Sequence, residues 1–112
     1  MGKEKAIKLT LFQGEITETV RAEDDLLIMY KIPRKELSKK NTKDLYKGEA
    51  GIYLLYSNSD IYVGQTKDLE KRLKQHTGKS FWNKTILFYS NTKDPWTTTD
   101  LDYLEDYFIK KS

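Results

Sequence analysis

Two tyrosines occur where strand geometry would bring their phenols together. A cluster of turn-forming residues at 57–60 separates two apolar runs, which predicts a β-hairpin. A loop centred on this cluster pairs Tyr53 with Gly64 and makes Tyr62 a diagonal neighbour of Tyr53 on the same face, roughly 7–8 Å away. The small Gly64 would then leave room for a ligand beside the phenols. The alternative is a half-buried aromatic pair in an ordinary sheet.

A basic pair follows the expected hairpin. Arg72 and His76 are four residues apart, so a helix would place them on one face. The guanidinium of Arg72 could stabilise charge on a phosphate, because it offers a rigid fork of donors. His76 is the only histidine in the chain and could donate a hydrogen bond or relay a proton. The alternatives are a surface charge near Glu70 or Asp68 for Arg72, and an ordinary helix-end residue for His76.

Three acids near the end of the chain form a third group. Asp102, Glu105 and Asp106 stand at i, i+3 and i+4, which places them together on a helix. A hard divalent cation prefers one or two such carboxylates together with waters and substrate phosphate. The spacing does not choose among the three, and a solvated acidic face is the alternative.

The elements that must position these groups run in the order strand, strand, helix, strand, helix. We expect strands at 51–56 and 61–63 with Gly64 ending the second, a helix from Thr66 or Asp68 to about His76, a strand over 81–89, and a last helix capped by Thr98 or Thr99. This order predicts an α/β (α+β) fold with a small central antiparallel three-stranded sheet flanked by helices.

Residues 1–48 are expected to form a β-rich N-terminal extension that packs on the unit at 49–112. Segments 7–12 and 16–20 alternate around a Gly-containing turn, which predicts a hairpin. A short apolar run at 26–32 predicts a further strand closed by Pro33, and the polar stretch at 34–46 predicts one or two short helical turns.

Composition limits the class of protein. The chain has 112 residues, enough for one domain with a modest core. It contains no apolar run near the ~20 residues that a membrane span requires, and no apolar signal-peptide core. Cysteine is absent, which excludes disulfides and thiolate zinc sites. We therefore expect a cytoplasmic protein that does not enter a membrane.

The charge is distributed unevenly along the chain. The net charge is only +3, but residues 31–47 hold seven Lys or Arg and residues 65–84 hold six, whereas residues 94–106 hold five acids and no base. Two basic stretches beside an acidic one would suit a phosphate backbone next to a metal site. Ordinary solvated faces are the alternative.

Taken together, these residues resemble the GIY-YIG nuclease superfamily. Gly51-Ile52-Tyr53, followed after eight residues by Tyr62-Val63-Gly64, resembles the two signatures that name the family, with Val63 where the name has Ile. Arg72-Leu73-x-x-His76 resembles the helix that bears the family's catalytic arginine. Leu104-Glu105 resembles its metal-binding glutamate.

The resemblance implies a metal-dependent endonuclease that hydrolyses phosphodiester bonds, with DNA as the preferred nucleic acid. One Mg²⁺ or Mn²⁺ would be held by Glu105, and Tyr53 would take a proton from the attacking water, although a phenol with a pKa near ~10 needs help to do so. Arg72 would stabilise the transition state, Tyr62 would position Tyr53 or the water, and His76 would contact the phosphate or the leaving oxygen. Backbone contacts would come from Lys67, Lys71, Lys74 and Lys84, and Gly51 and Gly64 would be structural.

Two features refine the resemblance. Phe81-Trp82-Asn83-Lys84 and the hairpin before Ile32-Pro33-Arg34 resemble a bacterial branch whose members carry a β-rich leader and often an extra C-terminal domain. The family usually has an Asn beyond its glutamate helix, so we expect the nuclease-like domain to be truncated at Ser112. A non-cleaving nucleic-acid-binding or regulatory module on the same fold is the main alternative function, followed by a plain interaction domain.

Overall fold

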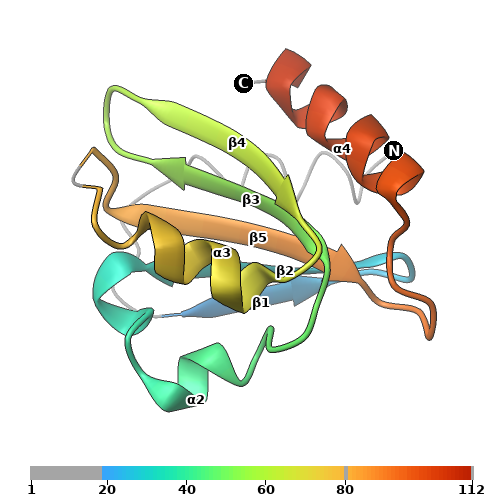
Figure 1. Cartoon of the computed structure of the whole chain (residues 1–112), viewed down its shortest axis with the longest axis horizontal. Coiled ribbons are helices and arrows are strands. Elements are labelled where there is room, and N and C mark those ends of the chain that lie inside the picture. Colours follow the sequence, from blue (N-terminus) through green and yellow to red (C-terminus); the bar gives the residue numbers. More distant parts are fainter. Residues whose placement is uncertain (1–18, 80, 112) are drawn as a thin grey trace.

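The computed structural model describes residues 19–79 and 81–111, and its centre is one antiparallel sheet (Figure 1). The sheet has five strands in the order β1-β2-β5-β3-β4. Their bounds are β1 Val20–Glu23, β2 Leu27–Pro33, β3 Gly51–Tyr56, β4 Ile61–Thr66 and β5 Lys84–Ser90. The α+β class is therefore confirmed.

The sheet is wider than the sequence predicted. The expected three strands are present as β5-β3-β4, but β2 pairs with β5 from Leu27↔Ser90 to Pro33↔Lys84, and β1 pairs with β2. A three-stranded sheet would have left one edge of β5 without hydrogen-bond partners, and β2 supplies them. The expectation of a three-stranded sheet was wrong because it assigned β2 to an N-terminal extension packed on the sheet, not to the sheet itself. The hairpin expected at 7–12 and 16–20 lies, except for its last two residues, outside the described residues.

Side chains alternate between the two faces of the sheet and form two cores. On one face, Tyr53 and Leu55 pack with Leu69 and Leu73 of α3 (Leu69–His76). On the other face lie the buried residues Ile52, Leu54, Ile86 and Phe88, together with Leu101 of α4 (Thr98–Lys111). Helices α3 and α4 therefore cover opposite faces of the sheet, with α3 in front of it in Figure 1 and α4 along β4.

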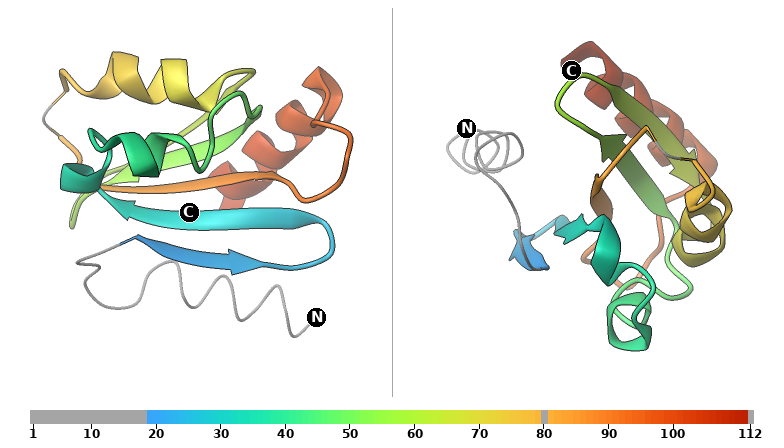
Figure 2. Two further views of the ribbon diagram at one scale, coloured as in Figure 1. Left: turned by 90° about the horizontal axis from the view of Figure 1, so that it is seen from below. Right: turned by 90° about the vertical axis from the view of Figure 1, so that its left-hand side faces the viewer.

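Two short helical turns connect β2 to β3, as the sequence predicted. They are the 3₁₀ helix η1 (Arg34–Glu36) and α2 (Lys40–Lys43). Figure 2 shows α2 and α3 on the same side of the sheet. Described residues 19–48 thus contribute two strands to the sheet and two short helical turns on the α3 side of it.

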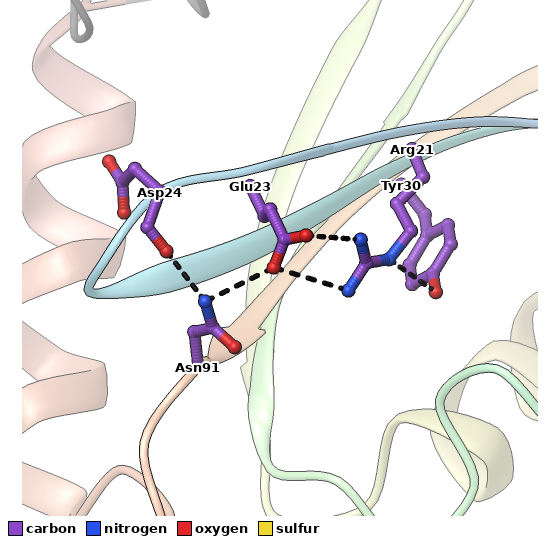
Figure 3. Close-up of polar contacts among 5 residues, drawn as sticks. All are labelled: Arg21, Glu23, Asp24, Tyr30 and Asn91. Atoms are coloured by element: carbon purple, nitrogen blue, oxygen red, sulfur yellow. Dashed lines mark hydrogen bonds and ion pairs between the residues drawn. The ribbon is translucent and has the colours of Figure 1, made fainter.

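A polar network fixes the β1–β2 hairpin to the end of β5 (Figure 3). The Arg21 guanidinium donates to Glu23 Oε1 at 2.7 Å and to the Tyr30 hydroxyl at 3.1 Å. Asn91, directly after β5, donates from Nδ2 to the Asp24 carbonyl at 2.6 Å and to Glu23 at 3.3 Å. These contacts hold the edge of the sheet that lies farthest from β4.

Several element boundaries differ from the sequence-based expectations. β4 continues to Thr66, so Gly64 does not end it, and β5 begins at Lys84, so Phe81 and Trp82 precede the strand. The cap of α4 is Thr97 rather than Thr98 or Thr99. Thr97 Oγ1 accepts from the Asp100 N–H at 3.2 Å while Asp100 Oδ2 accepts from the Thr97 N–H at 2.9 Å, which is a reciprocal capping box. Within the described residues, no helix has the length and apolar character needed to cross a membrane.

Candidate active site

The β3–β4 hairpin brings the two phenols together, as the register predicted. Tyr53 pairs with Gly64 and Leu55 pairs with Tyr62, so Tyr53 and Tyr62 project from one face. Their ring centroids are 6.1 Å apart. A shift of one residue in this pairing would have placed Tyr62 on the opposite face. The hairpin register therefore determines that a phenol pair exists.

Gly64 is necessary for a different reason from the one the sequence suggested. A Cβ atom at Gly64 would lie 2.4 Å from Cζ and 2.5 Å from Oη of Tyr53. The ring of Tyr53 therefore occupies the space that the missing side chain leaves, and the expectation that a ligand would enter this space was wrong. As a result Tyr53 is 0% exposed, whereas Tyr62 is 39% exposed.

Helix α3 adds a guanidinium and an imidazole to the phenol pair. Arg72 Nε lies 3.1 Å from the Tyr53 hydroxyl, and His76 Nε2 lies 3.1 Å from the same oxygen. The His76 ring centroid is 5.4 Å from that of Tyr53 and 5.5 Å from that of Tyr62. We call Tyr53, Tyr62, Arg72 and His76 the phenol cluster.

The Tyr53 hydroxyl takes part in two hydrogen bonds of this cluster. Arg72 can only donate, so the Tyr53 oxygen accepts from it. The second bond joins the Tyr53 hydroxyl to His76 Nε2, and the tautomer of His76 sets which of the two atoms donates. His76 Nδ1 is buried and has no hydrogen-bond partner within the described part of the chain. Tyr53 thus joins a permanent cation to an imidazole.

Burial and neighbouring charges shift the pKa values of the cluster. Burial lowers the pKa of His76, and the cations of Lys79 and Arg72 lower it further. Burial raises the pKa of Tyr53, while the hydrogen bond from Arg72 opposes that rise. The hydrogen bond with Tyr53 raises the pKa of Arg72 most, and a smaller contribution comes from a hydrogen bond with Tyr62. The guanidinium therefore interacts with both phenols. At neutral pH, Arg72 is therefore the charged member of the cluster.

The start of α3 is held against the sheet by a cap and a close approach. Asp68 accepts the Lys71 N–H at 3.1 Å, which confirms one of the two predicted caps. The Leu69 N–H donates to the Glu49 carbonyl at 2.9 Å. A Cβ atom at Gly51 would lie 2.1 Å from the Phe88 carbonyl oxygen and 2.9 Å from Leu69 Cδ1. Gly51 is therefore structural, because it lets β5 and α3 approach β3 closely.

The end of α3 is held by residues outside it. Trp82 Nε1 donates to the His76 carbonyl at 3.2 Å. Arg34 donates to the carbonyls of Trp82 and Thr77, and its guanidinium lies 4.3 Å from the Trp82 ring centroid. Arg34, directly after β2, and Trp82, two residues before β5, therefore fix the end of α3 that carries His76.

The acids lie apart from the phenol cluster. Gln65 Nε2 donates to Asp102 at 2.6 Å and to Glu105 at 3.2 Å. Asp106 instead pairs with Lys110 at 2.9 Å. We call Gln65, Asp102 and Glu105 the carboxylate cluster. Because Gln65 directly follows Gly64 on β4, it projects from the opposite face to Tyr62, toward α4.

The structure therefore does not bring all predicted site residues into direct contact. No hydrogen bond or ion pair joins Glu105 to the phenol cluster within the described residues. The two clusters are separated by the backbone of β4. Sequence reasoning missed Gln65 altogether, since a glutamine after a strand glycine carries no recognisable signal until its partners on α4 are known.

The donor set of the carboxylate cluster fits a divalent cation such as Mg²⁺. Asp102 and Glu105 offer two carboxylates, and the Gln65 side chain offers a carbonyl oxygen, all of them hard donors. Residues 19–79 and 81–111 contain no group of three or more His, Cys, Asp and Glu that could hold a metal ion. One or two carboxylates suffice for Mg²⁺, because it retains waters and binds substrate phosphate.

The predicted backbone-binding lysines do not gather at one place. Lys67, Lys71 and Lys74 are exposed. Lys71 and Lys74 line a cavity of about 650 Å³ between α3 and the turns η1 and α2. Lys84 lies over Tyr56 at 5.8 Å from its ring centroid, on the α4 face of the sheet.

Comparison with known proteins adds one finding. A family model described as the GIY-YIG catalytic domain matches residues 49–112. The chain belongs to the GIY-YIG family. The signatures expected from the sequence are thus the two strands of the β3–β4 hairpin, and GIY-YIG nucleases are generally dependent on a divalent metal. No curated protein and no solved structure matches the chain significantly.

Proposed function

We propose that this GIY-YIG chain is a divalent-metal-dependent endonuclease domain that hydrolyses phosphodiester bonds, with DNA as its preferred substrate. The observation that carries the proposal is the phenol cluster: two phenols, one permanent cation and one neutral imidazole meet around a single hydroxyl. A purely structural aromatic pair would not require a guanidinium and an imidazole bonded to the same buried oxygen.

Each group of the phenol cluster has a task in hydrolysis. The reaction forms a bond from a water oxygen to phosphorus and breaks the bond to the leaving ester oxygen. The water loses one proton and the leaving oxygen gains one. A phenol takes part in the first proton transfer, and Arg72 stabilises the charge that develops on the phosphoryl oxygens. His76 is hydrogen-bonded to the Tyr53 hydroxyl and can exchange a proton with it.

The carboxylate cluster would hold the metal. Glu105, with Asp102 and Gln65 beside it, would bind one Mg²⁺ or Mn²⁺, which supplies Lewis-acid stabilisation of a phosphoryl oxygen when bound. β4 is the last strand in the sheet order and carries Tyr62 on one face and Gln65 on the other. A phosphodiester lying along this edge would meet groups from both faces.

The distribution of charge supports the proposed substrate. Lys67, just before α3, and Lys71 and Lys74 within it are exposed, so they can contact a phosphate backbone of any base sequence. Lys84 would add a contact on the α4 face of the sheet. The nuclease-like unit would comprise residues 49–112, with 1–48 as its extension. We propose a cytoplasmic location, as the sequence analysis expected.

A non-cleaving nucleic-acid-binding module remains the second candidate. The observation that favours it is the separation of Glu105 from the phenol cluster by the β4 backbone. Such a module would bind duplex DNA with the same basic residues but would leave it intact.

Nicking of supercoiled plasmid separates the two candidates. The chain should nick the plasmid with Mg²⁺ and not with EDTA, and an identically purified Arg72→Ala variant should not nick it. Equal nicking by Arg72→Ala would identify a contaminant and overturn the enzyme assignment. Binding of the plasmid without nicking by the wild-type chain would favour the non-cleaving module.

A further inference from the structure

Helix α3 presents different groups on its two flanks. The side chains that it buries against the sheet are those of Leu69, Leu73 and His76. On one flank of this buried stripe, Arg72 donates to the Tyr53 hydroxyl. Lys74 follows Arg72 by two residues, which is more than half a turn of a 3.6-residue helix, so it lies on the other flank. The phenol cluster is therefore on one side of α3, and the region that Lys74 faces is on the other.

The region that Lys74 faces is the cavity of about 650 Å³ between α3 and the turns η1 and α2. Its charged lining residues are four cations and two acids, namely Arg34, Lys43, Lys71, Lys74, Asp68 and Glu70. The Arg34 guanidinium is already bonded to the carbonyls of Trp82 and Thr77, and Asp68 caps α3. The excess positive charge of the cavity is therefore carried by lysines from two helices.

The lysines of this cavity are not neutralised by ion pairs. Within residues 19–79 and 81–111, no ion pair joins Lys43, Lys71 or Lys74 to an acid. Lys43 lines the cavity from α2, and the other two line it from α3, so cations approach the same space from two walls. An anion placed between like charges is attracted by both and offsets their repulsion. The cavity therefore has the charge of an anion-binding site.

The width of α3 indicates which anion reaches the cavity. An α-helix with its side chains is about 10–12 Å across, and the major groove of B-DNA is about 12 Å wide. Lys71 and Gln75 are exposed on the outward side of α3, between the flank of Arg72 and the flank of Lys74. When this outward side enters a major groove, the backbone of one strand runs past Arg72, and the backbone of the other strand runs past the cavity.

We propose that the cavity between α3 and α2 binds the phosphate backbone of the second strand of a duplex, while Arg72 meets the phosphate to be cut on the first strand. This inference rests on the proposed function and deepens it, because it makes the substrate double-stranded. Lys43 contacts the second strand from α2, outside the residues 49–112 that the family model matches. The part of the chain before the matched domain thus takes part in substrate binding.

Binding titrations of Lys43→Gln test the proposal without any cleavage. In EDTA, this variant should bind a short DNA duplex more weakly and reduce the magnitude of the salt slope by about one, whereas its binding of one strand of that duplex alone should be unchanged. Lys40→Gln is the matched control, because Lys40 is exposed on the same helix and does not line the cavity. Lys43→Arg keeps the charge and should bind the duplex as the wild type does. Urea midpoints check that all three variants are folded.

Three results would overturn the proposal. Equal weakening by Lys43→Gln and Lys40→Gln would mean that only net charge matters. Equal weakening for duplex and single strand would mean that the cavity holds a continuation of the first strand. Binding of inorganic phosphate that is lost in Lys43→Gln, with duplex binding unchanged, would mean that the cavity holds a free anion.

Failure of the proposed function is a separate outcome. A wild-type chain that cuts nothing, but whose binding of duplex depends on Lys43 and not on Lys40, would refute the endonuclease and support the cavity as the site of the second strand. A chain that cuts DNA while Lys43→Gln and Lys40→Gln bind duplex equally well would support the endonuclease and refute the second-strand site.

Discussion

The two faces of β4 are built differently. On the α3 face, Tyr53 and His76 of the phenol cluster are buried, and the Tyr53 oxygen is bonded to a cation and an imidazole. On the α4 face, the amide of Gln65 links Asp102 and Glu105, and Asp102 is exposed. The side chains of the first face are held by their own hydrogen bonds and packing. The carboxylates of the second face have the donor set that fits a divalent cation.

Under the proposed function, this difference gives the two helices different tasks. Groups that stabilise a transition state must be fixed in advance, and burial against a rigid sheet achieves this. A hard cation binds through exposed carboxylates and waters, which require less packing. Changes on the α3 face should therefore affect stability and chemistry together, whereas changes on the α4 face should affect metal binding and chemistry but not the fold.

The largest effect is expected at Glu105. Glu105→Ala should lower Mg²⁺-dependent cleavage by several orders of magnitude, because it removes the proposed metal ligand, while the urea midpoint stays unchanged. Asp106→Ala is the matched control, since Asp106 pairs with Lys110 instead of Gln65. Asp102→Ala should fall between the two. If Asp106→Ala loses cleavage and Glu105→Ala keeps it, the ligand has been assigned to the wrong acid.

On the α3 face, Gly64→Ala should destabilise the fold. The new Cβ would lie 2.4 Å from Tyr53 Cζ, so the ring must move, and overpacking of this kind typically costs about 1–3 kcal/mol. Gly78→Ala is the control, because a Cβ there meets nothing within 4 Å. Urea unfolding measures both. Equal stability of the two variants would show that Tyr53 is not held against Gly64.

A smaller effect concerns the basic side of α3. Lys71→Glu and Lys74→Glu should weaken binding to duplex DNA in EDTA and reduce the magnitude of the salt slope by about one per lost phosphate contact. Lys93→Glu, with the same change in net charge at an exposed loop position, is the control. Titrations at several salt concentrations provide the slopes. Equal weakening in all three variants would mean that only net charge matters.

The smallest effect should appear in the pH dependence of stability. The pKa of His76 in the folded chain is lowered from its ordinary value of 6.5, so the unfolded chain binds more protons as pH falls below that value. The free energy of unfolding should therefore decrease as pH falls through this region, and His76→Gln should decrease less. Urea unfolding at pH 7.5 and pH 5.5 measures the difference. Parallel losses in both proteins would rule out His76 as the cause.

Sequence reasoning was most successful where a local rule determines geometry. The turn cluster and strand alternation correctly predicted the pairing of Tyr53 with Gly64 and the shared face of Tyr62. The spacing of Arg72 and His76 on α3 was likewise local. Both follow from the fixed repeats of strand and helix.

The remaining features depend on contacts between distant segments. The joining of β2 to β5, the contact of Arg34 with the end of α3, and the bridge from Gln65 to α4 span many residues of sequence. The burial of Tyr53 against Gly64 could not be predicted either, because a glycine in a strand is compatible with an open space or a filled one.

Titration with Mn²⁺, followed by the EPR signal of the unbound ion, tests the division of the site most directly. It reports metal binding without cleavage and compares one variant from each face. Glu105→Gln should bind Mn²⁺ much more weakly than the wild-type chain, and Arg72→Ala should bind it as well as the wild type. Loss of Mn²⁺ binding in Arg72→Ala, or full binding in Glu105→Gln, would contradict the assignment of the metal to the α4 face.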